Sequence, residues 1–181
     1  MQLGGKYQVL FHNAPQYWIR ATDFTPFFWN EKDGQKTSVQ IKTISLDELW
    51  KANIVNAILN SSLFYIWFIS LSDCRHLNLR EIENFPISFK NVNSSVQKEF
   101  SELVPKLMKS LQASKKRKST QYKTTGSVEY DEYYPRLSKP IIDEIDRVLA
   151  KHYNFTEEEL DYIINYDIKY RMGKELEGNE D

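Results

Sequence analysis

The chain reads NSSLFYIWFISL from Asn60 to Leu71 and continues SDCRHLN from Ser72 to Asn78. The first part is apolar from Leu63 onward, with Ser70 as its one break. It is much shorter than the roughly 18 to 20 residues that a membrane span needs, so it predicts a buried core helix. The polar residues that follow predict a loop held in place by that helix, and loops positioned by a rigid element commonly carry binding sites.

Side chains that form hydrogen bonds at surfaces are concentrated in this loop and just after it. The candidates for contacts to a ligand are Arg75, His76, Asn78 and Arg80. A planar guanidinium reads a guanine edge bidentately and also grips phosphate, which puts the arginines first. A purely structural interpretation stays open. In it, Ser72-Asp73 ends one helix, and Asn78 with Glu81 forms a capping box that starts the next.

Charge is distributed unevenly along the chain. The 181 residues carry 24 Lys and Arg against 25 Asp and Glu. Residues 1–126 hold 17 of the basic residues and 10 of the acidic ones, which leaves 7 basic against 15 acidic for residues 127–181. A basic front and an acidic back favour a polyanionic partner on one side, although solvated surface charge gives the same pattern. A single cysteine, Cys74, excludes an internal disulfide and, without a signal-peptide pattern, predicts a cytoplasmic protein.

Residues 1–45 predict β-structure. Strand formers dominate positions 7–11 and 17–22, and Asp33-Gly34 predicts a hairpin turn because glycine adopts a left-handed conformation without steric cost. Three basic residues of this region are further candidates for contacts to an anionic partner: Arg20, Lys36 and Lys42. Solvation of lysines on an exposed edge strand explains the two lysines equally well.

Helical periodicity governs most of the remaining chain, in residues 46–59 and 92–112 and again after Ser138. Residues 113–126 have almost no apolar side chains and predict a mobile linker. Its four adjacent cations also suit non-specific phosphate contact: Lys115, Lys116, Arg117 and Lys118. We predict a recognition domain (1–112), a basic linker (113–126) and an acidic helical segment (127–181). The fold class is α+β, an N-terminal strand and hairpin region packed on a helical scaffold and followed by a C-terminal helical segment.

The sequence offers little for catalysis. Its glycines fit neither of the common phosphate-binding loop patterns, and its three histidines lie far apart. Cys74 and His76 supply only half of a zinc site, so no metal site is predicted. Asp161, Asp167 and Lys169 faintly match a nuclease carboxylate-lysine set, but the helical pattern around them favours a helix surface. We therefore predict no catalytic residue and no bound cofactor in this chain.

Several segments together resemble one protein family. They are Asn60–Phe64, Ser72–Asn78, Phe85-Pro86 and, most distinctively, Lys139–Asp146 with Asp161–Gly173. These segments resemble the C-terminal end of bacterial adenine-specific DNA methyltransferases of type II, often type IIG, restriction-modification systems. That end is a target recognition domain, similar to the TaqI-like C-terminal specificity domain. The matching segments span most of residues 45–173, whereas the N-terminal strands resemble the family only in general character.

The resemblance implies that the parent enzyme transfers a methyl group from S-adenosylmethionine to the exocyclic nitrogen of a flipped adenine. The family's catalytic motif, Asn/Asp-Pro-Pro-Tyr/Phe, is absent because no two prolines are adjacent, and its glycine-rich cofactor motif is absent too. We therefore expect a fragment that binds double-stranded DNA beside the catalytic methyltransferase domain of its parent chain, away from any membrane and inactive alone. The alternative is a helical interaction module that docks a methylase core or a nuclease subunit.

Overall fold

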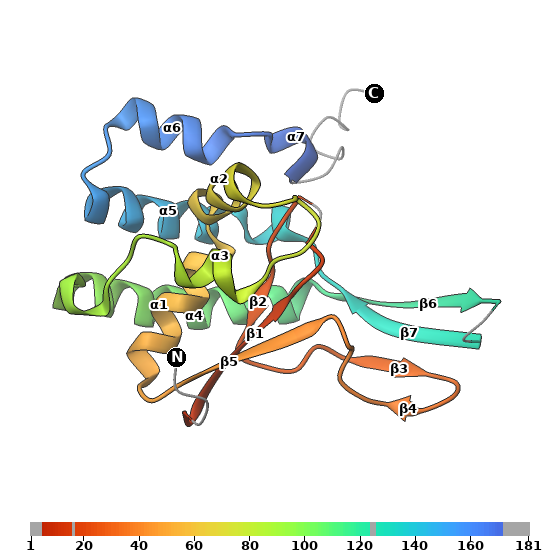
Figure 1. Ribbon diagram of the computed structural model, residues 1–181. Coiled ribbons are helices and arrows are strands. Elements are labelled where there is room, and N and C mark those ends of the chain that lie inside the picture. The colour runs from red at the N-terminus through yellow and green to blue at the C-terminus, as the bar shows by residue number, and fades with distance from the viewer. Residues whose placement is uncertain (1–4, 16, 124–125, 172–181) are drawn as a thin grey trace.

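The computed structural model describes residues 5–15, 17–123 and 126–171, and its helices and two antiparallel sheets confirm the predicted α+β class. A helical body contains the three-stranded sheet β2-β1-β5, and an arm formed by the four-stranded sheet β4-β3-β7-β6 projects from one end of it (Figure 1). The strands are β1 (Tyr7–His12), β2 (Ala21–Thr22), β3 (Phe28–Asn30), β4 (Gly34–Gln35), β5 (Ile41–Leu46), β6 (Lys116–Tyr122) and β7 (Gly126–Glu132). The helices are α1 (Leu49–Asn60), α2 (Ser62–Leu71), α3 (Leu79–Glu83), α4 (Ser94–Ser114), α5 (Lys139–Tyr153), α6 (Glu157–Asn165) and α7 (Ile168–Arg171), with 3-10 turns at Phe89–Asn91 and Pro135–Ser138.

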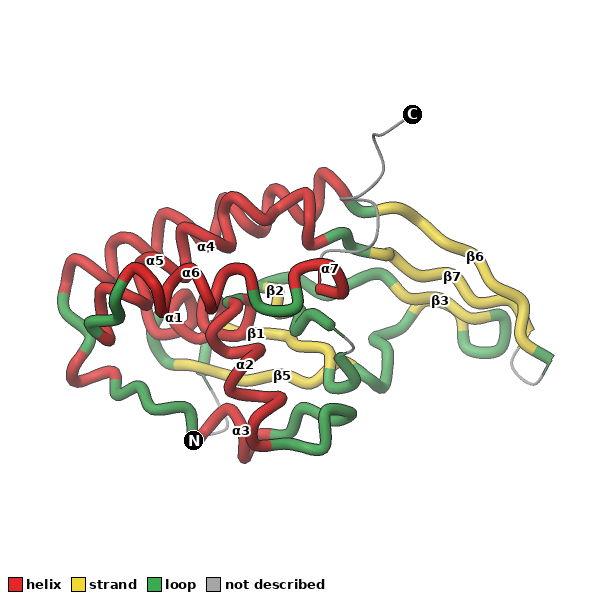
Figure 2. Tube along the Cα trace, turned by 90° about the horizontal axis from the view of Figure 1, so that it is seen from above, coloured by secondary structure: helices red, strands yellow, loops and turns green. Residues whose placement is uncertain are grey.

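The body is a sheet with helices layered on it. β1 pairs antiparallel with β5, from Tyr7 opposite Leu46 to His12 opposite Ile41. α1 packs against this sheet, α4 packs on α1, and α5 packs on α4 (Figure 2). Fully buried side chains from all of these layers fill the core, among them Phe11, Ile54, Phe100, Leu107 and Ile145. The body is therefore stabilised mainly by apolar burial.

The chain turns sharply where α1 meets α2. The two helices are bent by 67°, and the Ser61 hydroxyl oxygen accepts a hydrogen bond from the N–H of Phe64 at 3.0 Å, which caps α2. The Asn60 side-chain amide ties this bend to β2, because it exchanges hydrogen bonds with the backbone of Ala21 at 2.9 and 3.3 Å. The predicted helix forms, but only its inner face is buried: Phe64 and Phe68 are both 0% exposed, whereas Leu71 at its end is 54% exposed.

A buried polar cluster joins α2, α5 and α7 beside this bend. The Asp146 carboxylate accepts hydrogen bonds from the N–H groups of Ser62 at 2.9 Å and Leu63 at 3.2 Å. Arg171 donates from Nη2 to the Ser62 hydroxyl at 3.0 Å and lies over the Tyr65 ring, 4.8 Å from its centroid. Burial raises the pKa of Asp146 to about 6, although these hydrogen bonds and the charge of Arg171 act in the opposite direction. Three of the segments that carry the family resemblance therefore meet in one cluster.

The arm shows that the linker predicted for residues 113–126 is wrong. α4 continues to Ser114, and β6 then pairs with β7, Lys116 opposite Glu132 and Tyr122 opposite Gly126. The sequence hides this strand because it is exposed along nearly its whole length and so lacks the apolar alternation of a half-buried strand. Its partner β7 stands where the acidic helical segment was predicted to begin. The boundary at residue 126 therefore cuts through a single hairpin.

Two further predictions concern the N-terminal strands. Gly34, the first residue of β4 after the turn from β3, has a φ of 73°, the left-handed conformation expected there, whereas the strand predicted over 17–22 shortens to β2. No single helix in the described part of the chain is long and apolar enough to span a membrane. Only α1 and α2 taken together, across their 67° bend, reach that length and composition.

Candidate nucleic-acid interface

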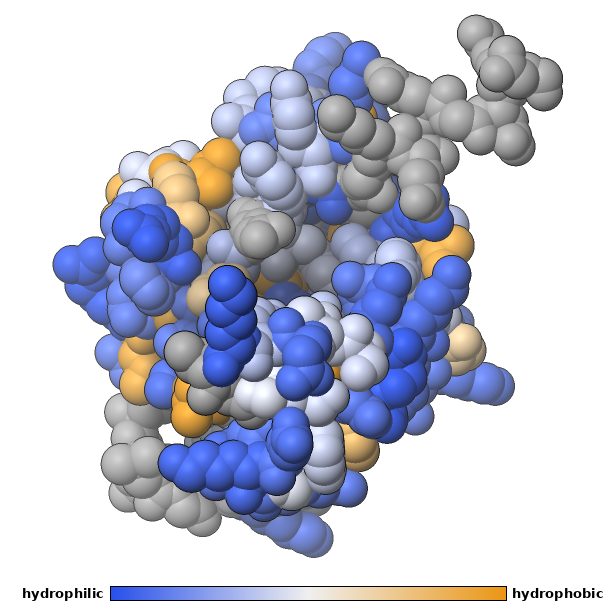
Figure 3. All heavy atoms as spheres, turned by 90° about the vertical axis from the view of Figure 1, so that its right-hand side faces the viewer, coloured by the Kyte–Doolittle hydropathy of each residue, from blue (hydrophilic) through white to orange (hydrophobic). Residues whose placement is uncertain are grey.

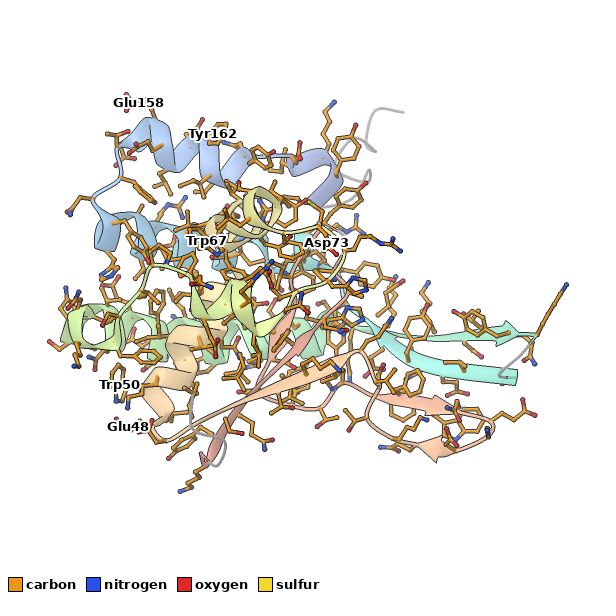
Figure 4. The ribbon with its side chains drawn as sticks, viewed as in Figure 1. Glu48, Trp50, Trp67, Asp73, Glu158 and Tyr162 are labelled. Carbon is orange, nitrogen blue, oxygen red and sulfur yellow. The ribbon has the colours of Figure 1, made fainter. Side chains whose placement is uncertain are left out.

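Three surface features meet at the end of the body from which the arm projects. They are the arm itself, the polar loop of residues 72–78, and the connection of residues 13–20. The N–H of Leu77 donates to the carbonyl of Asn13 at 2.9 Å, and the N–H of Asn13 donates to the carbonyl of Gln40 at 2.9 Å. Asp73 lies at this end of the body in Figure 4, and Figure 3 shows a mainly hydrophilic face that is hollowed between arm and body.

Asp73 determines the shape of the polar loop through the backbone. Its Oδ1 accepts hydrogen bonds from the N–H groups of Arg75 and His76, both at 2.9 Å, and these bonds, that of His76 first, lower the pKa of Asp73 to about 2. Cys74 adopts a φ of 57° within this turn. The guanidinium of Arg75 is exposed and has no ion pair with a carboxylate among the described residues. Asp73 thus orients the loop and leaves the Arg75 side chain pointing to solvent.

Asn78 and Arg80 are tied to local structure. The N–H of Asn78 donates to Glu81 Oε2 at 2.9 Å, and its side-chain amide donates to the carbonyl of His76 at 3.2 Å. Arg80 Nη2 donates to Glu81 Oε1 at 2.7 Å. Glu81 is only 3% exposed, so its buried carboxylate needs these donors. The structural interpretation therefore accounts for Asn78 and partly for Arg80, while Arg75 and His76 stay exposed.

Lys115 and Arg117 are occupied within the arm. Lys115 Nζ lies 2.6 Å from Asp131 Oδ2, and Arg117 Nε lies 2.7 Å from Asp131 Oδ1. Burial by itself would raise the pKa of Asp131, but the hydrogen bonds from Lys115 and Arg117 hold it below its ordinary value. Arg117 also stacks on the Phe27 ring, 3.4 Å from its centroid. These two cations hold the arm together.

Lys116 and Lys118 alternate with those residues along β6 and so point to the other face of the arm. Lys118 Nζ lies 3.5 Å from a carboxylate oxygen of Glu132, and Lys116 Nζ lies 5.4 Å from the centroid of the Tyr134 ring. Both lysines are exposed. They are the members of the basic run that remain suited to contact with a polyanion.

Two lysines of the candidate set remain, Lys36 and Lys42. Lys36 follows β4 in the arm and pairs with Asp33, three residues earlier in the same turn. Lys42 is exposed on β5, opposite Phe11 of β1. Lys36 thus lies in the arm and Lys42 on the strand that leads out of it, so both border the same end of the molecule.

A hollow of 490 Å³, here called the arm-base hollow, lies where the arm joins the body. Its lining includes His12, Tyr17, Trp18, Arg20, Tyr133 and Arg171. The Arg20 guanidinium lies 4.6 Å from the centroid of the Tyr133 ring, and burial lowers its pKa without removing its charge at neutral pH. Burial, followed by the charge of Arg20, also lowers the pKa of His12, so that imidazole is mainly neutral at pH 7. Arg171 is held by the Ser62 hydroxyl and lies beside the charge of Asp146, so Arg20 is the principal cation available in this hollow.

A second hollow, of 590 Å³, lies between the arm and the connection that leads into β5. It shares His12 and Arg20 with the arm-base hollow, and its other lining residues include Phe28, Val39 and Tyr130. Arg20 thus borders both hollows. The structure brings Arg20 and the polar loop to the same end of the body, although they are far apart in the sequence.

The sequence did not identify two exposed tyrosines on the rim of the arm-base hollow. Tyr17 and Tyr170 are 50% and 60% exposed, and their ring centroids are 5.8 Å apart. The chain's 11 tyrosines indicated that stacking surfaces were available, but not which residues would form them. Only the position of α7 against residues 13–20 brings these two rings together.

The described residues contain no group of three or more His, Cys, Asp or Glu side chains that could hold a metal ion. Comparison of the chain with protein-family models, with curated proteins and with solved structures found no match. The end of the body from which the arm projects combines exposed cations with exposed aromatic rings. It is therefore suited to contacts with an extended partner that carries negative charges and aromatic groups.

Proposed function

We propose that this chain is the DNA-recognition part of an S-adenosylmethionine-dependent, adenine-specific DNA methyltransferase of a restriction-modification system. The observation that carries the proposal is the convergence, at one end of the body, of a projecting antiparallel arm, the exposed Arg75 and the partly buried Arg20. Several DNA-reading proteins place strands of a β-sheet in a groove of DNA, and arginine suits both base edges and phosphates.

The contact residues take different roles in this proposal. Arg75 and His76 reach base edges or phosphates from the polar loop. The exposed lysines of the arm and of β5 contact phosphates: Lys36, Lys42, Lys116 and Lys118. Lys115 and Arg117 shape the arm, because Asp131 already occupies them. Non-specific affinity then comes from fewer cations than the basic run suggests.

Methyl transfer is assigned to a catalytic domain of the parent chain, since this chain has no Asn/Asp-Pro-Pro-Tyr/Phe motif. S-adenosylmethionine binds that domain, and double-stranded DNA lies between the two parts, in the cytoplasm. The cluster of Ser62, Asp146 and Arg171 supports the proposal, because three segments that resemble the family contribute to one buried contact network. We expect segments that form one structural scaffold to be joined by a network of this kind.

Fluorescence anisotropy with a labelled duplex of mixed sequence, at increasing salt, tests this function. Affinity should fall with a slope near 0.9 per phosphate neutralised, and no methyl group should be incorporated by the chain alone. Arg75→Ala should cost about 1 to 3 kcal/mol of binding to the target site if it reads a base. Its effect on stability should be at most about 1 kcal/mol, because the side chain is exposed.

Lys98→Ala is the matched control, since Lys98 is an exposed cation near the start of α4, whose other end leads into the arm. It should leave both DNA affinity and melting temperature unchanged. Salt-independent binding, or an Arg75→Ala protein that melts early but binds DNA normally, contradicts the proposal.

A second candidate function is docking of the catalytic domain. An apolar hollow of 330 Å³ is lined by Leu63, Trp67, Leu71, Phe85 and Tyr153, and Leu71 is 54% exposed. Exposed apolar surface of this kind is typical of interfaces. Leu71→Arg should weaken association with a separately produced catalytic domain, measured by sedimentation, and leave DNA affinity unchanged. If Leu71→Arg and the wild-type chain associate equally with the catalytic domain, this surface is not the docking site.

A further inference from the structure

The arm-base hollow gathers buried polar atoms that lack partners. Among the described residues, three buried side-chain atoms have no hydrogen-bond partner: Trp18 Nε1, the Tyr133 hydroxyl and Arg171 Nε. All three residues line this one hollow, and Tyr133 and Arg171 are only 7% and 3% exposed. Leaving a buried polar group without a partner is unfavourable. These three atoms are themselves closed to solvent, so a ligand in the hollow meets other atoms of the same residues.

The three atoms share one chemical character, because each carries a proton to donate. The indole nitrogen and the guanidinium nitrogen are donors only. Burial raises the pKa of Tyr133 to about 12, so its phenol keeps its proton at neutral pH. These three residues therefore bring no negative charge to the wall of the hollow.

The charges around the hollow favour an anionic ligand. Arg20 forms no ion pair with a carboxylate among the described residues, although Asp131 contributes some attraction. Asp131 is held by Lys115 and Arg117, so one carboxylate faces three cations. Glu132 also lines the hollow, but its carboxylate accepts a hydrogen bond from the Tyr134 hydroxyl and pairs with Lys118. The positive charge of Arg20 thus remains available to an anion.

The rim adds a stacking surface. Tyr17 and Tyr170 come from opposite ends of the chain, are both half-exposed or more, and lie ring beside ring at 5.8 Å. A base stacked on an aromatic side chain gains affinity without needing a particular sequence. An anion site in the floor and exposed rings at the rim together match the two ends of a nucleotide.

We propose that the arm-base hollow binds a single nucleotide, with its phosphate oxygens at Arg20 and its base against Tyr17 and Tyr170. The volume of 490 Å³ falls within the range of about 300 to 1,000 Å³ that small-molecule sites occupy. The nucleotide comes either from an unpaired position in DNA, in which case the inference rests on the proposed function, or from a free mononucleotide.

The test compares three probes on the full chain: a fully paired duplex, the same duplex with one unpaired nucleotide, and the four deoxynucleoside monophosphates. Wild-type protein should bind the duplex with the unpaired nucleotide more tightly than the paired duplex, because no base pair has to be opened. Tyr17→Ala should abolish this preference, with a loss of about fivefold or more, and Tyr17→Phe should retain it. Arg20→Gln should weaken the binding of every probe by about tenfold or more. Because Arg20 is partly buried, circular dichroism verifies that the variant still folds.

The outcomes separate the two proposals. If the chain binds both duplexes equally and no monophosphate, or if Tyr17→Ala keeps the preference, the nucleotide site is wrong while the DNA-recognition function stands. If monophosphates bind in a manner that depends on Tyr17 and Arg20 but neither duplex binds, the nucleotide site stands and the DNA-recognition function is wrong. If no probe binds, both are wrong.

Discussion

The body and the arm are both built on antiparallel sheets, but different forces stabilise them. In the body, β1 and β5 contribute Val9, Phe11 and Ile44 to a core that α1 and α4 close. In the arm, β6 buries none of its residues, and β7 buries only Val128 and Asp131. Apolar burial is insensitive to salt, whereas exposed ion pairs are screened by it. The arm should therefore open at a lower free energy than the body, as suits an element that adapts to a ligand.

One buried carboxylate in each region shows the same difference on a small scale. Asp146 in the body caps α2 and keeps a raised pKa, because burial outweighs the favourable contacts it makes. Asp131 in the arm has a lowered pKa, because Lys115 and Arg117 outweigh its burial. Both side chains are almost inaccessible to solvent, yet their contributions to stability should depend on pH in opposite directions.

Removing an aromatic ring from each region should give the largest contrast. Phe64 is 0% exposed and packs against Phe85 at 5.3 Å between centroids, so Phe64→Ala should cost about 3 to 5 kcal/mol of unfolding free energy. Phe27 at the base of the arm is only partly buried, and Phe27→Ala should cost about 1 kcal/mol. Urea unfolding followed by circular dichroism measures both. Equal costs would show that the arm shares the core of the body.

The pH dependence of the body should be the next largest effect. The pKa of Asp146 in the folded state, about 6, lies above the unfolded value of about 3.9, so the folded protein binds the extra proton. Its contribution is fully present below about pH 4 and is lost as pH rises through 6, by up to about 3 kcal/mol. Asp146→Asn cannot titrate, so its unfolding free energy should lack this decline. If the difference in unfolding free energy between the wild-type protein and Asp146→Asn stays constant from about pH 4 to pH 7, the pKa of Asp146 is not raised.

The arm should respond more weakly and with the opposite sign. The lowered pKa of Asp131 means that its stabilisation is present above the unfolded value of about 3.9 and is lost as pH falls through the folded value. Its partners are partly exposed, so Asp131→Asn should cost only about 1 kcal/mol at neutral pH. Amide hydrogen exchange should accelerate in β6 and β7 and not in α1. Glu129→Gln, which removes a longer contact of 3.9 Å to Arg117, is the control and should change little.

Much of the body was determined by local sequence patterns. The apolar run from Leu63 to Leu71 identified a helix, of which the inner face is buried, and Gly34 identified a turn, because each pattern acts through its own few residues. The structural alternative for Asn78 was also evident from the sequence, since Glu81 three residues later is sufficient to form a capping contact. Such features depend on neighbours within one turn or one hairpin, and no distant partner is needed to predict them.

The arm and the arm-base hollow were decided by tertiary structure. Nothing local marks residues 116–122 as a strand, because the carboxylate that receives Lys115 and Arg117 lies in β7, beyond a turn. The sequence assigned those cations to a linker for that reason. Arg20, Tyr17 and Tyr170 likewise share one hollow only because α7 packs against the connection of residues 13–20. Periodicity and capping determine which elements form, whereas the pairing of distant charges and rings requires the packed chain.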